Sequence, residues 1–332
     1  MKLLHHPDFR DVLVAAAEEY GVPEQFVEKD YYVTEALRIV EAGFSDQVAF
    51  KGGTSLSKGW GLIERFSEDI DLFLNPKTFV PALSRRGIDR EMKRLRDAIA
   101  DHPGLTHLPD ESRKVTSLGR EDYFAYNSVL GEPRLIRPAV KVEPGIQSGD
   151  HPVERVELTS YACRFLHERG LGDIADDTAP FTMTLLHYRR TFVEKLFTIH
   201  GKVERLRLEG TAVERDARHY ADVHVLGNLP DVREMLRSPE YGEIKRDYDE
   251  KSRAFFPKSY RPPLDLGFSQ SEALFPGHDL RRELGRDYES QCRLLFYGAY
   301  PVSTRCSPVS RRSGSGCDTA SAQPRETQLW WT

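Results

Sequence analysis

The sequence predicts an α+β fold, in which a mixed β-sheet flanked by helices is followed by a C-terminal helical bundle. Three observations lead to this prediction. Helical and strand patterns alternate along the first part of the chain, whereas from about residue 182 onward only helical spacing of apolar residues recurs. The length of 332 residues suits one large domain or two smaller ones.

The chain begins with two predicted helices between about residues 8 and 42. Their apolar residues recur at helical spacing, and Gly21-Val22-Pro23 separates them. The apolar run Val48-Ala49-Phe50 then predicts a buried strand, which ends in a tight turn at Gly52-Gly53.

The turn is predicted to lead into further regular elements. Thr54 and Ser55 are suited to cap a helix that continues to about Ile63. The alternating stretch from Asp69 to Leu74 predicts a second strand. A basic amphipathic helix is expected over roughly residues 82–100. Further strands are expected near residues 121–130, 135–146 and 152–158.

The second part of the chain is predicted to be helical. One helix carries Phe192 and Ile199 on its apolar face, and three more are expected near residues 212–227, 240–255 and 279–297. After residue 300 the chain is rich in Ser, Arg, Thr and Gly without apolar periodicity, which indicates disorder. We therefore predict a catalytic domain with N-terminal helices at 1–180, a helical domain at 181–300 and a disordered or divergent tail at 301–332.

Composition and charge exclude several classes of protein. The chain has 52 acidic and 47 basic residues, a net charge of −5, which argues against a protein that coats nucleic acid but allows an enzyme that touches one RNA end. Four scattered cysteines without a C-x-x-C pair are expected to be free thiols. No apolar run suits a membrane span and no secretory signal is evident, so we expect a cytoplasmic protein without membrane contact.

The segment from Phe50 to Leu72 carries the predicted chemistry. Gly52 and Gly53 would let the backbone approach phosphate groups, and Thr54 and Ser55 would add hydroxyl donors. Asp69 and Asp71 are two apart on a predicted strand, so both face one side, where a cation would offset their repulsion. Magnesium or manganese, held by these carboxylates and bridging to substrate phosphates, fits this pattern and indicates nucleotidyl transfer.

Glu143 is the candidate for a third carboxylate of a two-metal site. It ends the apolar strand that starts at Ala139. Each motif has an ordinary alternative: Gly-Gly-Thr is a common turn, Asp-x-Asp is common on a solvated strand face, and Glu143 suits an exposed strand end. Their order and spacing together favour the functional interpretation. P-loop, dinucleotide-binding, zinc-protease and serine-hydrolase motifs are lacking in the sequence.

These residues resemble a known family. Lys51-Gly52-Gly53-Thr54-Ser55-Leu56 and the following Arg65–Leu72 stretch are similar to the AbiEii/AbiGii toxin family, within the DNA polymerase β-like nucleotidyltransferase superfamily. Three other segments also resemble this family: Glu28–Val33, Arg190–Leu196 and Arg218–Val223. The resemblance therefore covers roughly residues 10 to 300.

The resemblance implies a nucleotidyltransferase-type fold and a toxin of a type IV toxin–antitoxin or abortive-infection system. It implies that a nucleoside triphosphate is the substrate, that tRNA is the acceptor at its 3′ end, and that an antitoxin regulator is encoded nearby. Asp69 and Asp71 would bind metal, Lys195 would meet the triphosphate, and Asp222 would be an essential acid. The implied nucleotide-binding residues are Lys51, Gly52, Gly53, Thr54, Ser55, Ser67 and Lys195.

Several alternatives remain open. Lys195 also suits a solvated helix face, and Arg218 and Asp222 are spaced for an ordinary helical ion pair. The basic helix at 82–100 is interpreted as a solvated face, with contact to an RNA backbone as the alternative. The acceptor could instead be a small molecule such as an aminoglycoside, or the protein could be a nucleotide-binding regulator without transfer activity.

Overall fold

The computed structural model describes residues 1–67, 69–116, 118–131 and 136–301. The chain forms two compact units, Met1–Thr191 and Phe192–Thr332, which are taken one at a time below. The predicted disordered tail at 301–332 lies, apart from Pro301, outside the described residues.

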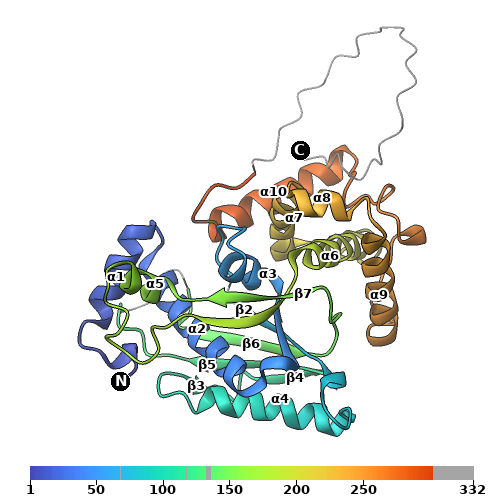
Figure 1. The fold of residues 1–332 in the computed structure, drawn as a ribbon. Helices are drawn as coiled ribbons and strands as arrows, with labels where there is room; N and C mark the ends of the chain where they lie inside the picture. The colour runs from blue at the N-terminus through green and yellow to red at the C-terminus, as the bar shows by residue number, and fades with distance from the viewer. Residues whose placement is uncertain (68, 117, 132–135, 302–332) are drawn as a thin grey trace. The chain divides into compact units, whose positions relative to one another are not determined.

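The first unit is built on an eight-stranded mixed sheet with the order β3-β5-β6-β2-β1-β8-β7, in which β4 pairs with β5 (Figure 1). Central β2 is antiparallel to β1 and parallel to β6, and β1 is parallel to β8. The predicted mixed sheet flanked by helices is therefore confirmed. The strands are β1 Val48–Lys51, β2 Asp69–Leu74, β3 Thr106–His107, β4 Arg113–Thr116, β5 Gly119–Ala125, β6 Ala139–Gly145, β7 Val153–Leu158 and β8 Phe181–Leu186.

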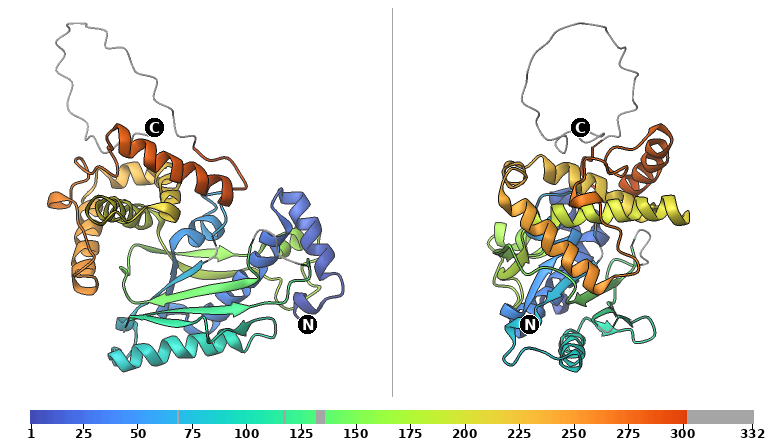
Figure 2. Two further views of the ribbon diagram at one scale, coloured as in Figure 1. Left: turned by 180° about the vertical axis from the view of Figure 1, so that it is seen from behind. Right: turned by 90° about the vertical axis from the view of Figure 1, so that its right-hand side faces the viewer.

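Four longer helices accompany this sheet: α1 Phe9–Tyr20, α2 Glu24–Phe44, α4 Arg85–Ala100 and α5 Tyr161–Glu168. Helices α2 and α4 pack on the sheet, with α4 running along it (Figure 2), while α1 and α5 pack on each other and on α2. The apolar stripe predicted for α4 is buried in this contact, because Met92, Leu95 and Ile99 are almost completely covered. These helices hold the sheet on which the candidate site is built.

Two local predictions were wrong. The stretch from Phe181 to Leu186, assigned to the helical part, is strand β8, so the first compact unit extends to Thr191 rather than ending at 180. No helix continues to Ile63: the chain after the turn forms α3 Gly52–Thr54 and a π-helical turn Ser55–Gly59. Neither Thr54 nor Ser55 caps a helix through its side chain, since both lie within these helical turns and no capping hydrogen bond from a backbone N–H reaches the Thr54 hydroxyl.

The second unit is helical, as predicted. Long α6 starts in the first unit at Tyr188 and continues to Glu209, and the apolar residues of the later helices close a separate core that includes Tyr220, Leu226 and Ile244. Among the described residues, no helix has the length and apolarity that crossing a membrane would require. The other helices are α7 His219–Gly227, α8 Pro230–Met235, α9 Pro239–Phe255 and α10 His278–Leu295.

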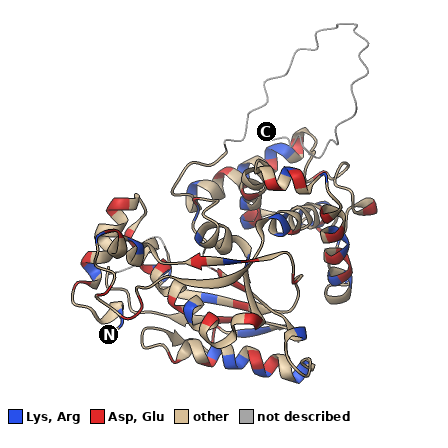
Figure 3. Ribbon diagram, in the orientation of Figure 1, with Lys and Arg blue, Asp and Glu red and all other residues tan. Residues whose placement is uncertain are grey.

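The basic side chains of α4 alternate with acidic ones along the helix (Figure 3). Lys93 pairs with Asp89 at 2.9 Å, and Arg94 pairs with Glu91 at 2.7 Å. Acidic neighbours thus pair with some of the basic residues, but the helix holds six basic and three acidic residues and keeps an excess of three positive charges. Both interpretations of α4, a solvated face and a contact with an RNA backbone, therefore stay open.

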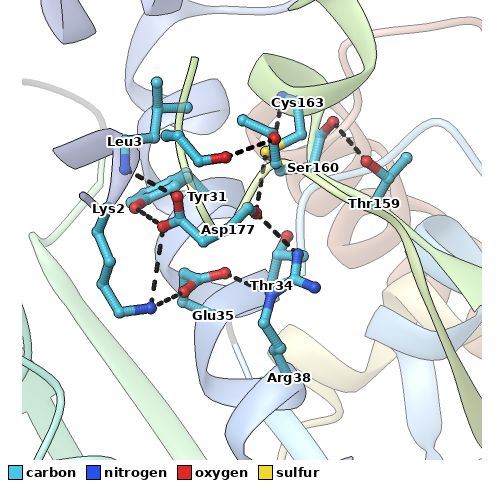
Figure 4. Close-up of polar contacts among 12 residues, drawn as sticks. Lys2, Leu3, Tyr31, Thr34, Glu35, Arg38, Thr159, Ser160, Cys163 and Asp177 are labelled. Atoms are coloured by element: carbon cyan, nitrogen blue, oxygen red, sulfur yellow. Dashed lines mark hydrogen bonds and ion pairs between the residues drawn. The ribbon is translucent and has the colours of Figure 1, made fainter. Parts of the chain in front are cut away.

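A cluster of polar residues joins the N-terminal Lys2 and Leu3 to helix α2 and to Asp177 (Figure 4). Glu35 on α2 accepts hydrogen bonds from Lys2 Nζ at 2.6 Å and from Arg38 Nε at 2.8 Å, and its side chain is 1% exposed. Asp177 accepts from the Tyr31 hydroxyl at 2.6 Å and from the Leu3 backbone N–H at 2.8 Å. Burial alone raises the pKa of Glu35, but contacts with His102, Lys2 and Arg38 outweigh it and lower that pKa to about 2.

Glu35→Gln is expected to destabilise the fold by about 3 kcal/mol at pH 7, since one pKa unit corresponds to about 1.4 kcal/mol. The folded-state pKa lies below the ordinary value of 4.5, so this stability is fully present above pH 4.5 and is lost as the pH falls toward 2. Urea titrations between pH 7 and 3 should show a shallower acid limb for the variant. Glu18→Gln on the exposed face of α1 is the matched control, and an unchanged acid limb for Glu35→Gln would refute this role.

Candidate active site

Charged side chains form two cross-strand rows at the centre of the sheet. Asp71 on β2 is paired with Lys51 on β1 and with Glu143 on β6. Asp69, two residues earlier on β2, is paired with Lys141 on β6. Directly paired residues project to the same face of a sheet, so the structure brings these five side chains together.

Strand β2 positions its carboxylates by simple alternation. Ile70 and Leu72 are completely buried, whereas the Asp69 side chain on the opposite face is 25% exposed. The apolar residues therefore anchor the strand in the core and leave the two aspartates accessible on one side. This is the arrangement predicted from the Asp-x-Asp spacing.

Lys141 lies among these carboxylates. Its ammonium forms an ion pair with Glu143 and lies 4.0 Å from Asp69 Oδ1. Burial raises the pKa of Glu143, and the negative charge of Asp71 raises it further. Burial lowers the pKa of Lys141, but Glu143 and Asp69 outweigh this and raise it overall. Three carboxylates and two lysines therefore meet in these two rows, which leaves an excess of one negative charge among the five.

The Gly52-Gly53 turn abuts the carboxylate row, which consists of Lys51, Asp71 and Glu143. Gly52 has φ +80°, and a Cβ on it would overlap the carboxylate of Asp71. A Cβ on Gly53 would lie 2.5 Å from Nη2 of Arg65 and 3.1 Å from the hydroxyl of Ser67. The two glycines therefore allow an acidic and a basic side chain to pack directly against the backbone of the turn.

The two hydroxyl groups after the turn have a different role from the predicted one. Thr54 Oγ1 donates to the carbonyl oxygen of Asp69 at 2.5 Å, and Ser55 Oγ donates to that of Gly52 at 2.9 Å. Both side chains are buried. Thr54 thus holds the turn against the start of β2, and Ser55 closes the turn on itself, so the donor hydrogen of each hydroxyl is already used within the protein.

Asp69 and Asp71 are the residues that could hold a divalent cation at this site. Among the described residues, no three His, Cys, Asp or Glu side chains are arranged to hold a metal ion by themselves. Mg²⁺ needs less, because it keeps several waters and is bound by one or two carboxylates together with substrate phosphates. Asp69 and Asp71 supply such oxygens on one face, and the missing Cβ of Gly52 makes room for the Asp71 carboxylate. The residues therefore fit a magnesium ion that arrives with a triphosphate.

The other two predicted residues pair with each other in the second unit. Lys195 Nζ on α6 lies 2.7 Å from Asp222 Oδ2 on α7, and Lys195 also contacts the ring of His219 at 3.0 Å. Asp222 is completely buried and Lys195 is 6% exposed, so the solvated-lysine alternative was wrong. This buried pair joins helices α6 and α7.

Asp222→Asn is expected to destabilise the protein by about 3–5 kcal/mol, because it leaves the Lys195 ammonium buried without its counter-ion. A second substitution, Lys195→Met, should restore much of that loss by removing the stranded charge. Urea unfolding of the two single variants and the double variant provides the measurement. If the two losses simply add in the double variant, the pair is not coupled.

Sequence reasoning gave no role to Arg65 and Lys141. Arg65 is 1% exposed, unusual for a large cation, and it lies against Gly53. Lys141 alternates with Glu143 along β6, so the same period-two argument that paired the aspartates could have placed both on one face. The sequence does not reveal that β6 pairs with β2, so it could not place Lys141 and Glu143 beside the two aspartates.

The chain is similar to nucleotidyltransferase toxins. The family described as "Nucleotidyl transferase AbiEii toxin, Type IV TA system" matches residues 35–298. A search of curated proteins found no match. The solved structure of MenT4, a nucleotidyltransferase toxin of Mycobacterium tuberculosis H37Rv, is 15% identical, with 85% of this chain and 89% of that chain covered and a TM-score of 0.47. A candidate nucleotidyltransferase from H. pylori is 16% identical, with 82% and 99% covered and a TM-score of 0.38.

Proposed function

Because this chain belongs to the AbiEii family of nucleotidyl transferase toxins of type IV toxin–antitoxin systems, we propose that it transfers a nucleotide from a nucleoside triphosphate to the 3′ end of tRNA. The family makes the protein a nucleotidyltransferase toxin. The RNA acceptor, the need for magnesium or manganese and the residue roles below are the proposed part.

The observation that carries this proposal is the contact between the glycine turn and the carboxylate row. Gly52 has no Cβ, and the Asp71 carboxylate occupies the space that a Cβ would fill. A triphosphate bound at the backbone of Gly53 would therefore lie next to Asp71 and its neighbour Asp69. Lys51 and Arg65 add positive charge beside the same turn.

In the proposed reaction the terminal ribose hydroxyl of the acceptor attacks the α-phosphorus of the nucleotide. A new oxygen–phosphorus bond forms, the bond to the β-phosphate oxygen breaks, and pyrophosphate leaves. A magnesium ion held by Asp69 and Asp71 would supply the positive charge that stabilises the phosphate oxygens. Glu143 lies beside Asp71 in the row and is the proposed acceptor of the hydroxyl proton.

Lys195 and Asp222 are proposed to act together. The carboxylate of Asp222 holds the Lys195 ammonium at 2.7 Å, so Asp222 is a positioning residue for that charge. A lysine fixed in this way suits the triphosphate as a point charge. The proposal thus assigns Asp222 an indirect role, through the lysine, rather than direct contact with the nucleotide.

An RNA end fits the charge of the chain better than a long nucleic-acid track. With a net charge of −5, the protein lacks the basic excess that a long phosphate backbone would require. Modification of the tRNA 3′ end in the cytoplasm would stop translation and growth. A type IV system implies an antitoxin, and we propose that a nearby transcriptional regulator supplies it without necessarily contacting the toxin.

The test incubates the purified chain and magnesium with each α-labelled nucleoside triphosphate, together with total RNA or with an aminoglycoside panel. Label in the tRNA band, mapped to the 3′ end by sequencing, is the expected result. Label only in an aminoglycoside would show that the acceptor is a small molecule. Absence of any transfer, with growth inhibition that survives in Asp69→Ala, would indicate a nucleotide-binding regulator.

Lys141→Met is expected to strengthen Mn²⁺ binding at least tenfold, because it removes a positive charge within 4.0 Å of Asp69 and in contact with Glu143. Two unit charges about 4 Å apart interact by about 4 kcal/mol near a protein surface. A tenfold change in affinity needs only about 1.4 kcal/mol of this energy. Electron paramagnetic resonance titration of free Mn²⁺ measures the affinity without relying on activity. Lys114→Met is the control, since that lysine pairs with Asp89 on α4. Equal or weaker binding by Lys141→Met would contradict a cation site at the row.

A further inference from the structure

A pocket of about 180 Å³ lies within the helical second unit and is open to solvent. Residues of α6, of α9 and of the segment after α9 line it, and none of them has a role in the proposed transfer. An engineered cavity of about 150 Å³ accepts one benzene ring, so this space can take the base of a nucleotide, while the attached ribose and phosphate would lie at its open side. The residues that decide its chemistry are Phe197, Lys202, Arg205, Tyr248, Tyr260 and Arg261.

Aromatic rings form the apolar part of the wall. Phe197 stacks on Tyr248 with ring centroids 4.5 Å apart, and Tyr260 lies edge-on to Tyr248 at 6.2 Å. The Tyr260 hydroxyl donates to Asp249 Oδ1 at 2.9 Å, which fixes the ring. A rigid aromatic wall of this kind is a stacking surface for a flat heterocycle, and every nucleobase has such a face.

The charged part of the wall is entirely basic. Two arginines and one lysine line the pocket and no Asp or Glu does, although acidic residues outnumber basic ones in the whole chain. The pocket lining is therefore more positively charged than the chain as a whole, and positive charge favours the binding of an anion.

The basic residues are not equally available. Lys202 pairs with Asp216, and Arg261 lies 3.6 Å from Glu209. In contrast, within the part of the chain that the structure describes, the Arg205 guanidinium makes no hydrogen bond or ion pair. A guanidinium is the cation best suited to bidentate contact with phosphate oxygens. Arg205 is thus the group that a phosphate would engage.

We propose that this pocket binds a nucleoside monophosphate unit, with the base against the Tyr248 and Tyr260 rings and the phosphate on Arg205. The unit is either a free nucleotide or one residue of an RNA chain, because both present the same ring and the same phosphate. The inference does not rest on the proposed function, since no pocket residue belongs to the carboxylate row, the glycine turn or the Lys195–Asp222 pair.

The test is photo-crosslinking of the full chain followed by peptide mapping. Two probes are used: 8-azido-AMP, and a short oligoribonucleotide that carries 8-azidoadenosine. Label on peptides containing Tyr248 or Tyr260 is expected from at least one probe, and the probe that labels at the lower concentration identifies the source. Label from neither probe on these peptides would overturn the proposal.

Matched variants test the role of Arg205. Arg205→Gln should reduce pocket labelling at least tenfold at a fixed probe concentration, and Arg205→Lys should retain more of it. Arg207→Gln is the control, since Arg207 lies on the same helix outside the lining and pairs with Glu204 and Glu272. Competition by AMP but not by adenosine or inorganic phosphate alone should show that both ring and phosphate are needed. Equal labelling in Arg205→Gln and the parent protein would refute the assigned contact.

Discussion

Replacing Asp71 by asparagine is expected to lower the rate of nucleotidyl transfer by about 10³-fold or more, the upper end of what loss of one electrostatic group at a reacting centre costs. The substitution keeps the shape that fits against Gly52 but removes the negative charge at the middle of the Lys51–Asp71–Glu143 row. The measurement is the initial rate of incorporation of α-labelled nucleotide, with growth inhibition on expression as a second readout.

The fold should survive this change. Asp71 lies on an accessible face of β2, and the buried residues that anchor the strand are untouched. Glu64→Gln, on an exposed position of the segment before β2, removes one negative charge nearby and should leave the rate unchanged. A folded Asp71→Asn protein that transfers nucleotide at a tenth of the parent rate or faster would be incompatible with a metal held by this aspartate.

Gly52→Ala has the second largest expected effect, a loss of at least 100-fold in transfer rate. Alanine at φ +80° costs about 1–2 kcal/mol in the backbone alone. In addition, its Cβ would overlap the Asp71 carboxylate, so the aspartate must move or the turn must open. A displacement of about 1 Å at a catalytic group is enough to lower a rate by about 10²-fold.

Two glycine controls separate these contributions. Gly61→Ala carries the same kind of backbone strain, with φ +62°, but nothing lies within 4 Å of its added Cβ. Gly43→Ala, in α2, has neither strain nor a close neighbour. Urea unfolding should show a loss of stability for Gly61→Ala, a larger loss for Gly52→Ala and a gain of about 0.5–1 kcal/mol for Gly43→Ala, while only Gly52→Ala loses activity. Comparable activity of Gly52→Ala and Gly61→Ala would mean that the contact with Asp71 is unimportant.

Elements with a strong local pattern were predicted well. The bounds of β2 agree with the structure because apolar and polar residues alternate from Asp69 to Leu72 and one face is buried. The amphipathic helix predicted at 82–100 is α4, which begins at Arg85 behind an N-capping Ser84. In both elements one face is buried and the other is not, so apolar and polar residues recur along the sequence with the period of the element.

Elements whose pattern is weak or shared were missed. Strand β8 also alternates, from Phe181 to Leu186, but it directly precedes a long helix and was assigned to the helical part. The short strands β3 and β4 have too few residues to show a period. The turn after Gly53 was expected to start a longer helix, because Thr54 and Ser55 are common caps. Only the position of β2 beside the turn shows why the Thr54 hydroxyl donates to the carbonyl oxygen of Asp69.

The sequence by itself determined the local features on which the proposed chemistry depends: a glycine turn, two aspartates on one face of a strand, and the apolar residues that bury the opposite face of that strand. These are local properties, set by spacing along a few neighbouring residues. The tertiary structure alone decided that Lys51, Lys141 and Glu143 flank those aspartates and that Lys195 pairs with Asp222. Such contacts join segments tens of residues apart, and they depend on strand register and helix packing, which no local pattern specifies.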